Sequence, residues 1–184
     1  MAELSRRRFI AASGAVAASV WLSANSRDVI AAGLHAAKAT RFETLSDADG
    51  ADIEAATANI IPTDGTPGAR EARVVYFIDR SLGTFAKEQR PVFEKGAKNL
   101  RARAAKLQRG AKSFAALTPA NQIAVLTAME KDKDGFFDAL RYGTVAGMLA
   151  NPEYGGNYNK AGWKLIGFND QFSWAAPFGW YDRV

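Results

Sequence analysis

The chain contains no cysteine and a single histidine, His35, among its 184 residues. The absence of cysteine excludes disulfide bonds, thiolate zinc sites, iron–sulfur ligation and a cysteine nucleophile. Beyond residue 39 the chain therefore lacks the residue types that ordinarily bind haem, copper or zinc. No G-x-G-x-x-G motif opens a helix after a strand, so no dinucleotide fingerprint is present. We expect no cofactor-binding and no metal-binding residues in this chain.

The sequence also lacks a convincing run of alternating strand residues and any internal repeat. Hydrophobic residues make up 48% of the chain, which is enough for a packed core. A length of 184 residues is typical of about one domain. We therefore predict one helical domain.

The N-terminal stretch "SRRRFIAASGAVAASVWLSA" has the features of an export signal. Its beginning fits the twin-arginine pattern of a serine, paired arginines (Arg6 and Arg7), any residue, Phe9 and an aliphatic residue. The apolar centre from Phe9 to Leu22 is only 14 residues long and rich in small residues. A spanning helix needs about 20 predominantly apolar residues. The alternative is a basic anchor helix that is left in place.

Signal cleavage is predicted after Ala39, because Ala37-Lys38-Ala39 has the small-x-small form of a cleavage site. The predicted organisation is a signal peptide over 1–39 and a helical domain over 40–184. The signal contains five of the 24 Lys and Arg residues and two of the 19 Asp and Glu residues, which leaves 19 bases and 17 acids. Because the remaining charge is nearly balanced, we do not expect nucleic-acid binding.

A twin-arginine signal indicates export of a folded protein through the twin-arginine translocase to the periplasm. A chain usually takes this route because it loads a cofactor or joins a partner in the cytoplasm. Since no cofactor motif is evident, the signal favours a partner that holds the cofactor and shares this chain's signal.

Hydrophobic residues at helical spacing predict an all-α bundle of about five helices. Ser46, three residues before Asp49, has the spacing of a capping box, and Thr118 before Pro119 is a typical helix start. From Asn151 onward the chain is rich in Gly, Asn and aromatic residues and is expected to be irregular. The helices are expected within 44–62, 69–85, 91–108, 117–132 and 135–152.

Two acidic stretches resemble calcium loops but lack an essential ligand. In "EKDKDGFFDALR" the twelfth position is Arg141 instead of a bidentate Glu, and in "LSDADGADIEAA" it is Ala56. We interpret both as acidic turns between helices. Glu71, Asp79 and Asp138 are candidates for buried acids, but nothing in the sequence pairs them, so no catalytic residue is assigned.

A basic run and an aromatic tail each permit two interpretations. The basic run is either a solvated helix face or a docking surface for an acidic partner. The aromatic residues of "NPEYGGNYNKAGWKLIGF" (151–168) either cap the bundle core or form a partner interface. Gly143 and Gly147, in a G-x-x-x-G spacing, indicate close helix packing. The basic residues are Lys95, Lys98, Arg101, Arg103, Lys106, Arg109 and Lys112.

Two segments resemble the paired signatures of the gluconate 2-dehydrogenase subunit 3 family. The first is "IIPTDGTPGAREARVVYFIDRSL" (60–82), which joins an Ile-Pro-Thr-Asp turn to a helix ending in Phe-Ile-Asp. The second is Tyr-Gly-Gly-Asn followed by Gly-Trp-Lys-x-Ile-Gly within 151–168.

The resemblance implies a non-catalytic small subunit of a periplasmic dehydrogenase for sugars or sugar acids, associated with the inner membrane. It further implies a flavoprotein large subunit that holds FAD, and a cytochrome c subunit that holds haem. The small subunit would supply the export signal, assist maturation of the large subunit and stay bound. Two alternatives remain open: a free-standing helical oxidoreductase or hydrolase that uses a carboxylate, and a carbohydrate-binding module.

The two signatures are the expected contact surface for the large subunit, since Gly-rich backbone adapts to a partner and aromatic residues supply buried area. The residues expected at this interface are Ile61, Pro62, Asp64, Tyr154, Gly155, Gly156, Asn157, Trp163, Lys164 and Phe168.

Overall fold

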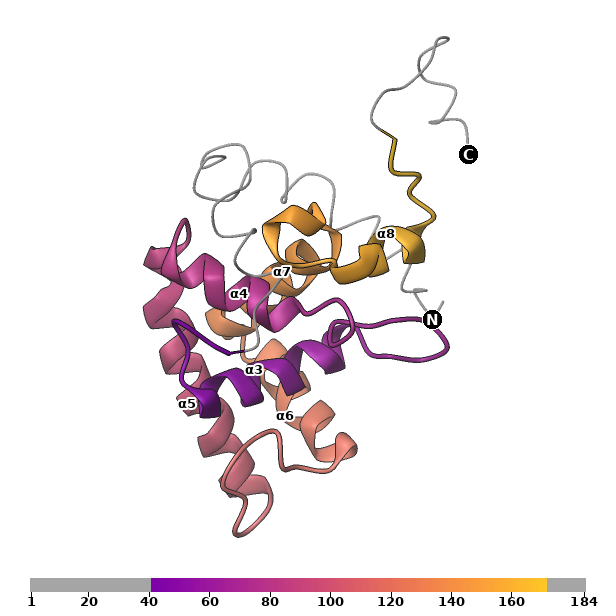
Figure 1. Ribbon diagram of the computed structural model, residues 1–184. Helices are drawn as coiled ribbons and strands as arrows, with labels where there is room; N and C mark the ends of the chain where they lie inside the picture. The colour runs from indigo at the N-terminus through magenta and orange to yellow at the C-terminus, as the bar shows by residue number, and fades with distance from the viewer. Residues whose placement is uncertain (1–40, 172–184) are drawn as a thin grey trace.

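The computed structural model describes residues 41–171, and these residues fold into α-helices and short 3-10 helices without a β-strand (Figure 1). The predicted all-α fold is confirmed. The predicted export signal, including Arg6, Arg7 and Phe9, lies outside the described residues. The elements in chain order are α3 (Asp47–Ile60), α4 (Val74–Gly83), η1 (Lys87–Gln89), α5 (Arg90–Leu107), α6 (Pro119–Lys131), α7 (Gly135–Leu149), η2 (Pro152–Tyr154), η3 (Tyr158–Lys160) and α8 (Ala161–Ile166).

Two predicted helix starts are confirmed by their hydrogen bonds. The side chain of Ser46 accepts a hydrogen bond of 3.1 Å from the backbone N–H of Asp49, at the start of α3. Thr118 caps α6 in the same way through the N–H of Asn121, and Pro119 occupies the first turn. These bonds satisfy N–H groups that have no partner within the helix.

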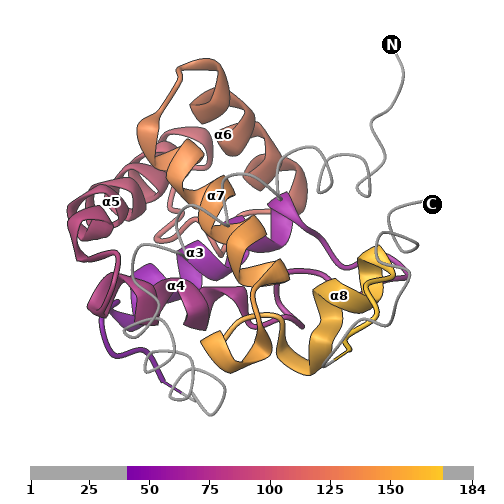
Figure 2. The ribbon, with the colours of Figure 1, turned by 90° about the horizontal axis from the view of Figure 1, so that it is seen from above.

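Helix α7 is the centre of the bundle: it packs against α3, α4, α5, α6 and α8 (Figure 2). It is buried along most of its length, and Leu140, Thr144 and Met148 have no exposed surface. Leu140 and Met148 belong to a single hydrophobic core shared by all the long helices. The segment after α7 is therefore held close to the core.

The predicted close packing at Gly143 and Gly147 is present between α7 and α4. A Cβ atom built at Gly147 would lie 3.0 Å from a ring atom of Phe77 and 3.2 Å from a methyl carbon of Val74. A Cβ atom at Gly143 would lie 3.3 Å from Ile78. The two glycines therefore allow α4, which carries part of the first signature, to approach α7 closely.

The tail is more regular than expected, because η2, η3 and α8 follow α7 in close succession. The acidic turn before α7 is used for local structure: Asp134 caps α7 through the N–H of Phe136, and Asp132 pairs with Arg103 at 2.8 Å. No helix within residues 41–171 is long and apolar enough to span a membrane.

Candidate partner interface

The first signature forms a tight turn that connects α3 to α4. Ile61 is buried, and its carbonyl oxygen accepts a 2.8 Å hydrogen bond from the N–H of Ala69. Gly68 lies close to the backbone of residues 61–63, so a Cβ atom at this position would be 2.5 Å from the carbonyl oxygen of Ile61. A side chain at position 68 would therefore open the turn.

Glu71 fastens the same turn from its other side. Its carboxylate accepts hydrogen bonds from the hydroxyl of Thr63 at 2.6 Å and from the N–H of Gly68 at 2.8 Å. These bonds lower the pKa of the Glu71 carboxyl below its usual value. Asp64 lies at the exposed tip, where its carboxylate accepts from the hydroxyl of Thr66, and Pro62 is half-buried.

The second signature is organised by Asn157, whose side chain is fully buried. Its Nδ2 donates to the carbonyl of Ala150 at 3.0 Å, and its Oδ1 accepts from the N–H of Gly162 at 2.7 Å. Its own N–H donates to the carbonyl of Gly147 at 2.7 Å. One asparagine thus ties the end of α7 to the start of α8, which explains why residues 152–166 are regular.

The glycines of the second signature also serve packing within the chain. Gly155 has a φ of 90°, a conformation that glycine adopts without strain. A Cβ atom at Gly156 would lie 2.1 Å from the carbonyl oxygen of Gly147, and one at Gly162 would lie 1.8 Å from that of Met148. Gly155 and Gly156 are buried, so they determine the backbone conformation of the second signature without forming part of its surface.

The aromatic residues of the second signature are divided between core and surface. Tyr154 is half-buried against the hydrophobic core. The indole N–H of Trp163 donates to the carbonyl of Leu149 at 2.8 Å. The ring of Trp163 packs edge-on against that of Phe168, with 5.1 Å between the ring centroids. Phe168 is 46% exposed, and Lys164 of α8 is exposed as well.

The two signatures meet in space, although the contacting residues Ala72 and Tyr158 are 86 positions apart in the sequence. The N–H of Tyr158 donates to the carbonyl of Ala72 at 3.2 Å, and the guanidinium of Arg73 lies 4.1 Å from the centre of the Tyr158 ring. Of the five non-glycine residues with positive φ in residues 41–171, four lie at this junction, a pattern that is common at functional sites. They are Arg73, Asn157, Asn159 and Lys160.

We define the signature face as the half-buried Arg73 and Trp163 together with the exposed Tyr158, Ile166 and Phe168. Three of its members are large hydrophobic residues with substantial exposure: 36% for Tyr158, 39% for Ile166 and 46% for Phe168. Only two other large hydrophobic residues of the described chain are comparably exposed, Leu107 and Ile123. An aromatic surface on an internally braced segment is suited to binding another protein.

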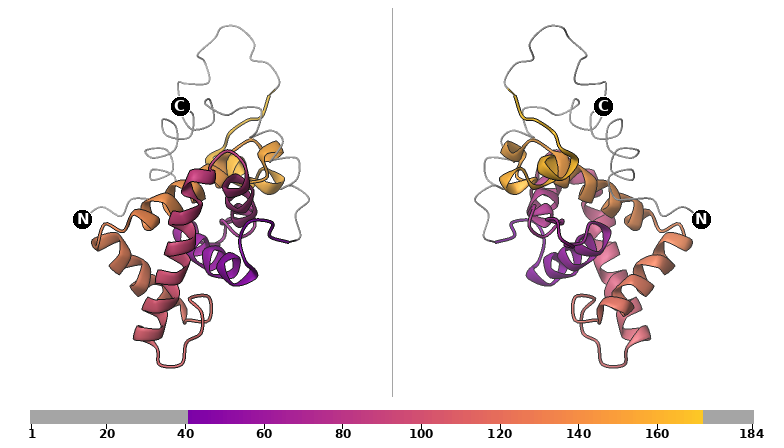
Figure 3. Two further views of the ribbon diagram at one scale, coloured as in Figure 1. Left: turned by 90° about the vertical axis from the view of Figure 1, so that its left-hand side faces the viewer. Right: turned by 90° about the vertical axis from the view of Figure 1, so that its right-hand side faces the viewer.

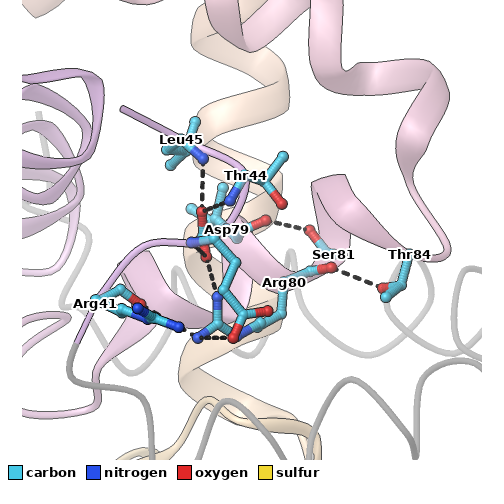
Figure 4. Close-up of polar contacts among 9 residues, drawn as sticks. Arg41, Thr44, Leu45, Asp79, Arg80, Ser81 and Thr84 are labelled. Atoms are coloured by element: carbon cyan, nitrogen blue, oxygen red, sulfur yellow. Dashed lines mark hydrogen bonds and ion pairs between the residues drawn. The ribbon is translucent and has the colours of Figure 1, made fainter. Parts of the chain in front are cut away.

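A buried acid lies beneath the N-terminal entry to the bundle (Figure 4). Asp79 has no exposed surface, and its carboxylate accepts hydrogen bonds from the backbone N–H groups of Glu43, Thr44 and Leu45 at 2.7–2.9 Å. It also pairs with the guanidinium of Arg80 at 2.5 Å. Asp79 therefore holds residues 43–45, just before α3, against α4.

The side chain of Arg80 is 5% exposed, so its guanidinium is stabilised mainly by contacts within the protein. Besides Asp79, it binds the carbonyl of Arg41 at 3.2 Å and the carboxylate of Glu43 at 3.0 Å. Its Nε atom is buried without a hydrogen-bond partner in the structure. A buried guanidinium with an unsatisfied N–H relies heavily on its charged contacts, which here are Asp79 and Glu43.

The network corrects the expectation that no partner pairs Asp79. The partner, Arg80, is the next residue in the sequence. Two adjacent residues of opposite charge within the apolar stretch from Val74 to Leu82 could have predicted this buried pair. Glu71 and Asp138 are exposed instead of buried. The three acids therefore do not form one site.

An apolar cavity of about 220 Å³ lies between α4, η1, α5 and α7. Burial raises the pKa of the Tyr142 hydroxyl, one of the few polar groups in its wall. The lining contains no carboxylate, lysine or arginine, and it consists of Ile78, Ser81, Leu82, Ala86, Gln89, Phe93, Ala139, Tyr142 and Gly143. Among residues 41–171, no group of three or more His, Asp or Glu side chains is placed to hold a metal ion.

Comparison with known proteins gave one result. A family model described as "Gluconate 2-dehydrogenase subunit 3" matches residues 47–170. No curated protein and no solved structure matches the chain. The matched range includes both signatures, Asp79 and the whole signature face.

Proposed function

The chain belongs to the gluconate 2-dehydrogenase subunit 3 family, a family of dehydrogenase-complex subunits, and from this membership we propose a specific role. It is the non-catalytic small subunit of a periplasmic FAD-dependent dehydrogenase for sugars or sugar acids. It carries the twin-arginine signal for the flavoprotein large subunit, stabilises that subunit and remains bound to it. A cytochrome c subunit accepts the electrons and associates the complex with the inner membrane.

The observation that carries the proposal is the match over residues 47–170, which includes both signatures. The structure supports it because the signatures fold against one another and leave Tyr158, Ile166 and Phe168 exposed. Such side chains supply buried area at interfaces with little loss of rotational freedom. The signature face is therefore the proposed contact with the large subunit, and the buried Asn157 and Gly156 keep it in shape.

The escort role is tested by the export signal itself. Replacing Arg6 and Arg7 with lysine is expected to leave the large subunit in the cytoplasm, because the proposed signal serves both chains. The measurement is flavoprotein content in periplasmic and cytoplasmic fractions after co-expression of the two subunits. A variant with Lys38→Arg, which keeps the twin arginines, is the control. Normal periplasmic flavoprotein in the R6K/R7K strain would contradict the escort role.

The signature face is tested by charge at its apolar positions. The double substitution Ile166→Asp/Phe168→Asp is expected to reduce flavoprotein that co-purifies with the tagged chain at least tenfold, since two carboxylates would be desolvated at the interface. The readout is flavin absorbance per mole of small subunit. Ile123→Asp, at an exposed apolar position on α6, is the control for general effects of an added charge. Equal flavin with all three proteins would remove the signature face from the interface.

A further inference from the structure

The cavity between α4, η1, α5 and α7 has an apolar floor and a more polar mouth. Three of its lining residues, Gln89, Ala139 and Tyr142, are half-buried and therefore lie where the cavity opens to solvent. The others are all buried and form the floor: Ile78, Ser81, Leu82, Ala86, Phe93 and Gly143. A molecule that enters from solvent would pass the three mouth residues and come to rest against a mainly apolar surface.

The size of the cavity limits what it can hold. Its volume is about 220 Å³, whereas protein interiors contain few voids larger than a water molecule. An engineered apolar cavity of about 150 Å³ stays free of water and binds benzene, and pockets for drug-sized ligands begin at about 300 Å³. The cavity therefore has room for one six-membered ring with a small substituent, and is too small for a dinucleotide.

The polarity of the lining selects a neutral ligand with one polar end. No charged side chain lines the cavity, and a charge buried without a counter-charge is costly. In the floor, the hydroxyl of Ser81 already donates its proton to the carbonyl of Ile78 at 2.7 Å. At the mouth, the carboxamide of Gln89 can both donate and accept a hydrogen bond, and the Tyr142 hydroxyl, whose pKa burial raises, stays neutral. An apolar ring would therefore face the floor, with its polar group at the mouth.

The surroundings of the mouth favour a small molecule over a protein segment. The core of a protein interface is depleted of charged residues and enriched in aromatic ones. None of the exposed large hydrophobic residues within 41–171 lines the cavity. The residues next to the mouth residues and Ala86 in the sequence are instead charged and exposed: Lys87, Glu88, Arg90, Asp138 and Arg141.

We propose that this cavity is a binding site for a small neutral molecule that consists of one apolar ring with a hydroxyl or carbonyl group at one end. The ring packs against Leu82 and Phe93, and the oxygen lies at the mouth beside Gln89 and Tyr142. The inference does not depend on the proposed function, because no residue of the signature face lines the cavity.

The cavity and the signature face lie at opposite ends of α4. Arg73 of the signature face is the N-cap of this helix, while Ser81 and Leu82 belong to its last turn. Eight residues of helix separate Arg73 from Ser81 by about 12 Å. In Figure 3, the connection from α4 to α5 lies toward the end of the bundle opposite the α5–α6 connection. A ligand in the cavity would therefore hold the end of α4 against α5 and α7 and leave the signature face open.

The test is an NMR titration of the isotopically labelled full-length chain with three probes: phenol, benzene and benzenesulfonate. Phenol is expected to shift the signals of Leu82, Phe93 and Gly143 in a saturable way. It should bind about threefold more tightly than benzene, because a mouth residue bonds its hydroxyl. Benzenesulfonate should bind at least about tenfold more weakly than phenol, since the cavity offers no counter-charge.

Two variants separate the cavity from other parts of the molecule. Ala139→Phe places a ring in the mouth and is expected to weaken phenol binding at least about tenfold. Ala128→Phe makes the same change at a half-buried position of α6 that does not line the cavity, and it is the matched control. The double variant Gln89→Leu/Tyr142→Phe is expected to keep benzene binding and lose the preference for phenol, a result that unfolding would not give.

Several outcomes would overturn this inference without affecting the test of flavoprotein co-purification. Absence of saturable shifts with phenol and benzene would show that the cavity takes no ring. Equal phenol binding by the Ala139 and Ala128 variants would place the probe outside the cavity. Benzenesulfonate that binds as tightly as phenol would exclude a site selective for neutral molecules. Nuclear Overhauser contacts from Phe93 to another segment of the chain, without a probe, would show that protein fills the cavity.

Discussion

Replacing Asp79 with alanine is expected to lower the free energy of unfolding by about 3–5 kcal/mol, because the buried Arg80 guanidinium loses its buried counter-ion. The substitution also removes the acceptor for the N–H groups of Glu43, Thr44 and Leu45. Arg80 would keep only the Arg41 carbonyl and the half-exposed Glu43 carboxylate. The measurement is urea unfolding of the purified chain, followed by circular dichroism.

The matched control for Asp79 is Asp138→Ala. The Asp138 side chain is 65% exposed and lies 3.5 Å from Arg141, so its loss is expected to cost less than about 1 kcal/mol. A second readout is amide hydrogen exchange, which should accelerate at residues 43–45 in the Asp79 variant more than in the core of α7. A loss of stability no larger than that of the Asp138 variant would show that the buried pair contributes little.

The contacts of Asp79 lie close to the predicted end of the export signal. Residues 43–45 follow closely on the predicted end of the signal at Ala39, and Asp79 binds them only when α4 has folded. The start of the described domain is therefore held by a contact that requires the folded bundle.

Replacing Gly156 with alanine is expected to destabilise the chain by about 2–3 kcal/mol and to detach the second signature from α7. The new Cβ atom would lie 2.1 Å from the carbonyl oxygen of Gly147, and this neighbour is backbone that cannot rotate away. The displacement would also break the 2.7 Å hydrogen bond from Asn157 to the same oxygen. Thermal unfolding measures the first effect, and limited proteolysis after residue 150 measures the second.

Gly135→Ala is the control for Gly156, because no atom lies within 4 Å of a Cβ built at that position. Alanine at the start of α7 is expected to increase the free energy of unfolding by less than about 1 kcal/mol. If Gly156→Ala behaves like Gly135→Ala, the tail is not held by close backbone packing. In the proposed complex, the Gly156 variant should also retain less flavoprotein, since the signature face depends on this packing.

The helices could be predicted from local patterns in the sequence. The caps at Ser46 and Thr118 and the apolar spacing along α5 and α7 depend on residues only three or four positions apart. The order of the tail could not be predicted in this way. Its regularity comes from Asn157, which bonds to Gly147 and Ala150 on one side and to Gly162 on the other.

The residues expected at the partner interface divide in the structure into exposed and buried members. The two signatures were expected to form one interface, and the structure brings them together at Tyr158 and Arg73. However, Gly155, Gly156 and Asn157 lie inside the chain, so they act on a partner only through the face that they support. Whether this face contacts the large subunit stays a prediction.

The sequence by itself determined the helical class, the main helix starts and the family signatures, because each of these depends on residues that are close together along the chain. Only the tertiary structure decided which charged side chains form contacts within the chain. It buries Asp79 against amides more than 30 residues away and commits Arg101 to Asp49 and Asp52 across about 50 residues. Within residues 41–171 it gives Lys98 and Lys106 no ion pair. The physical reason is that a charge is stabilised or left available by its neighbours in space, and for these residues the packing of distant helices selects those neighbours.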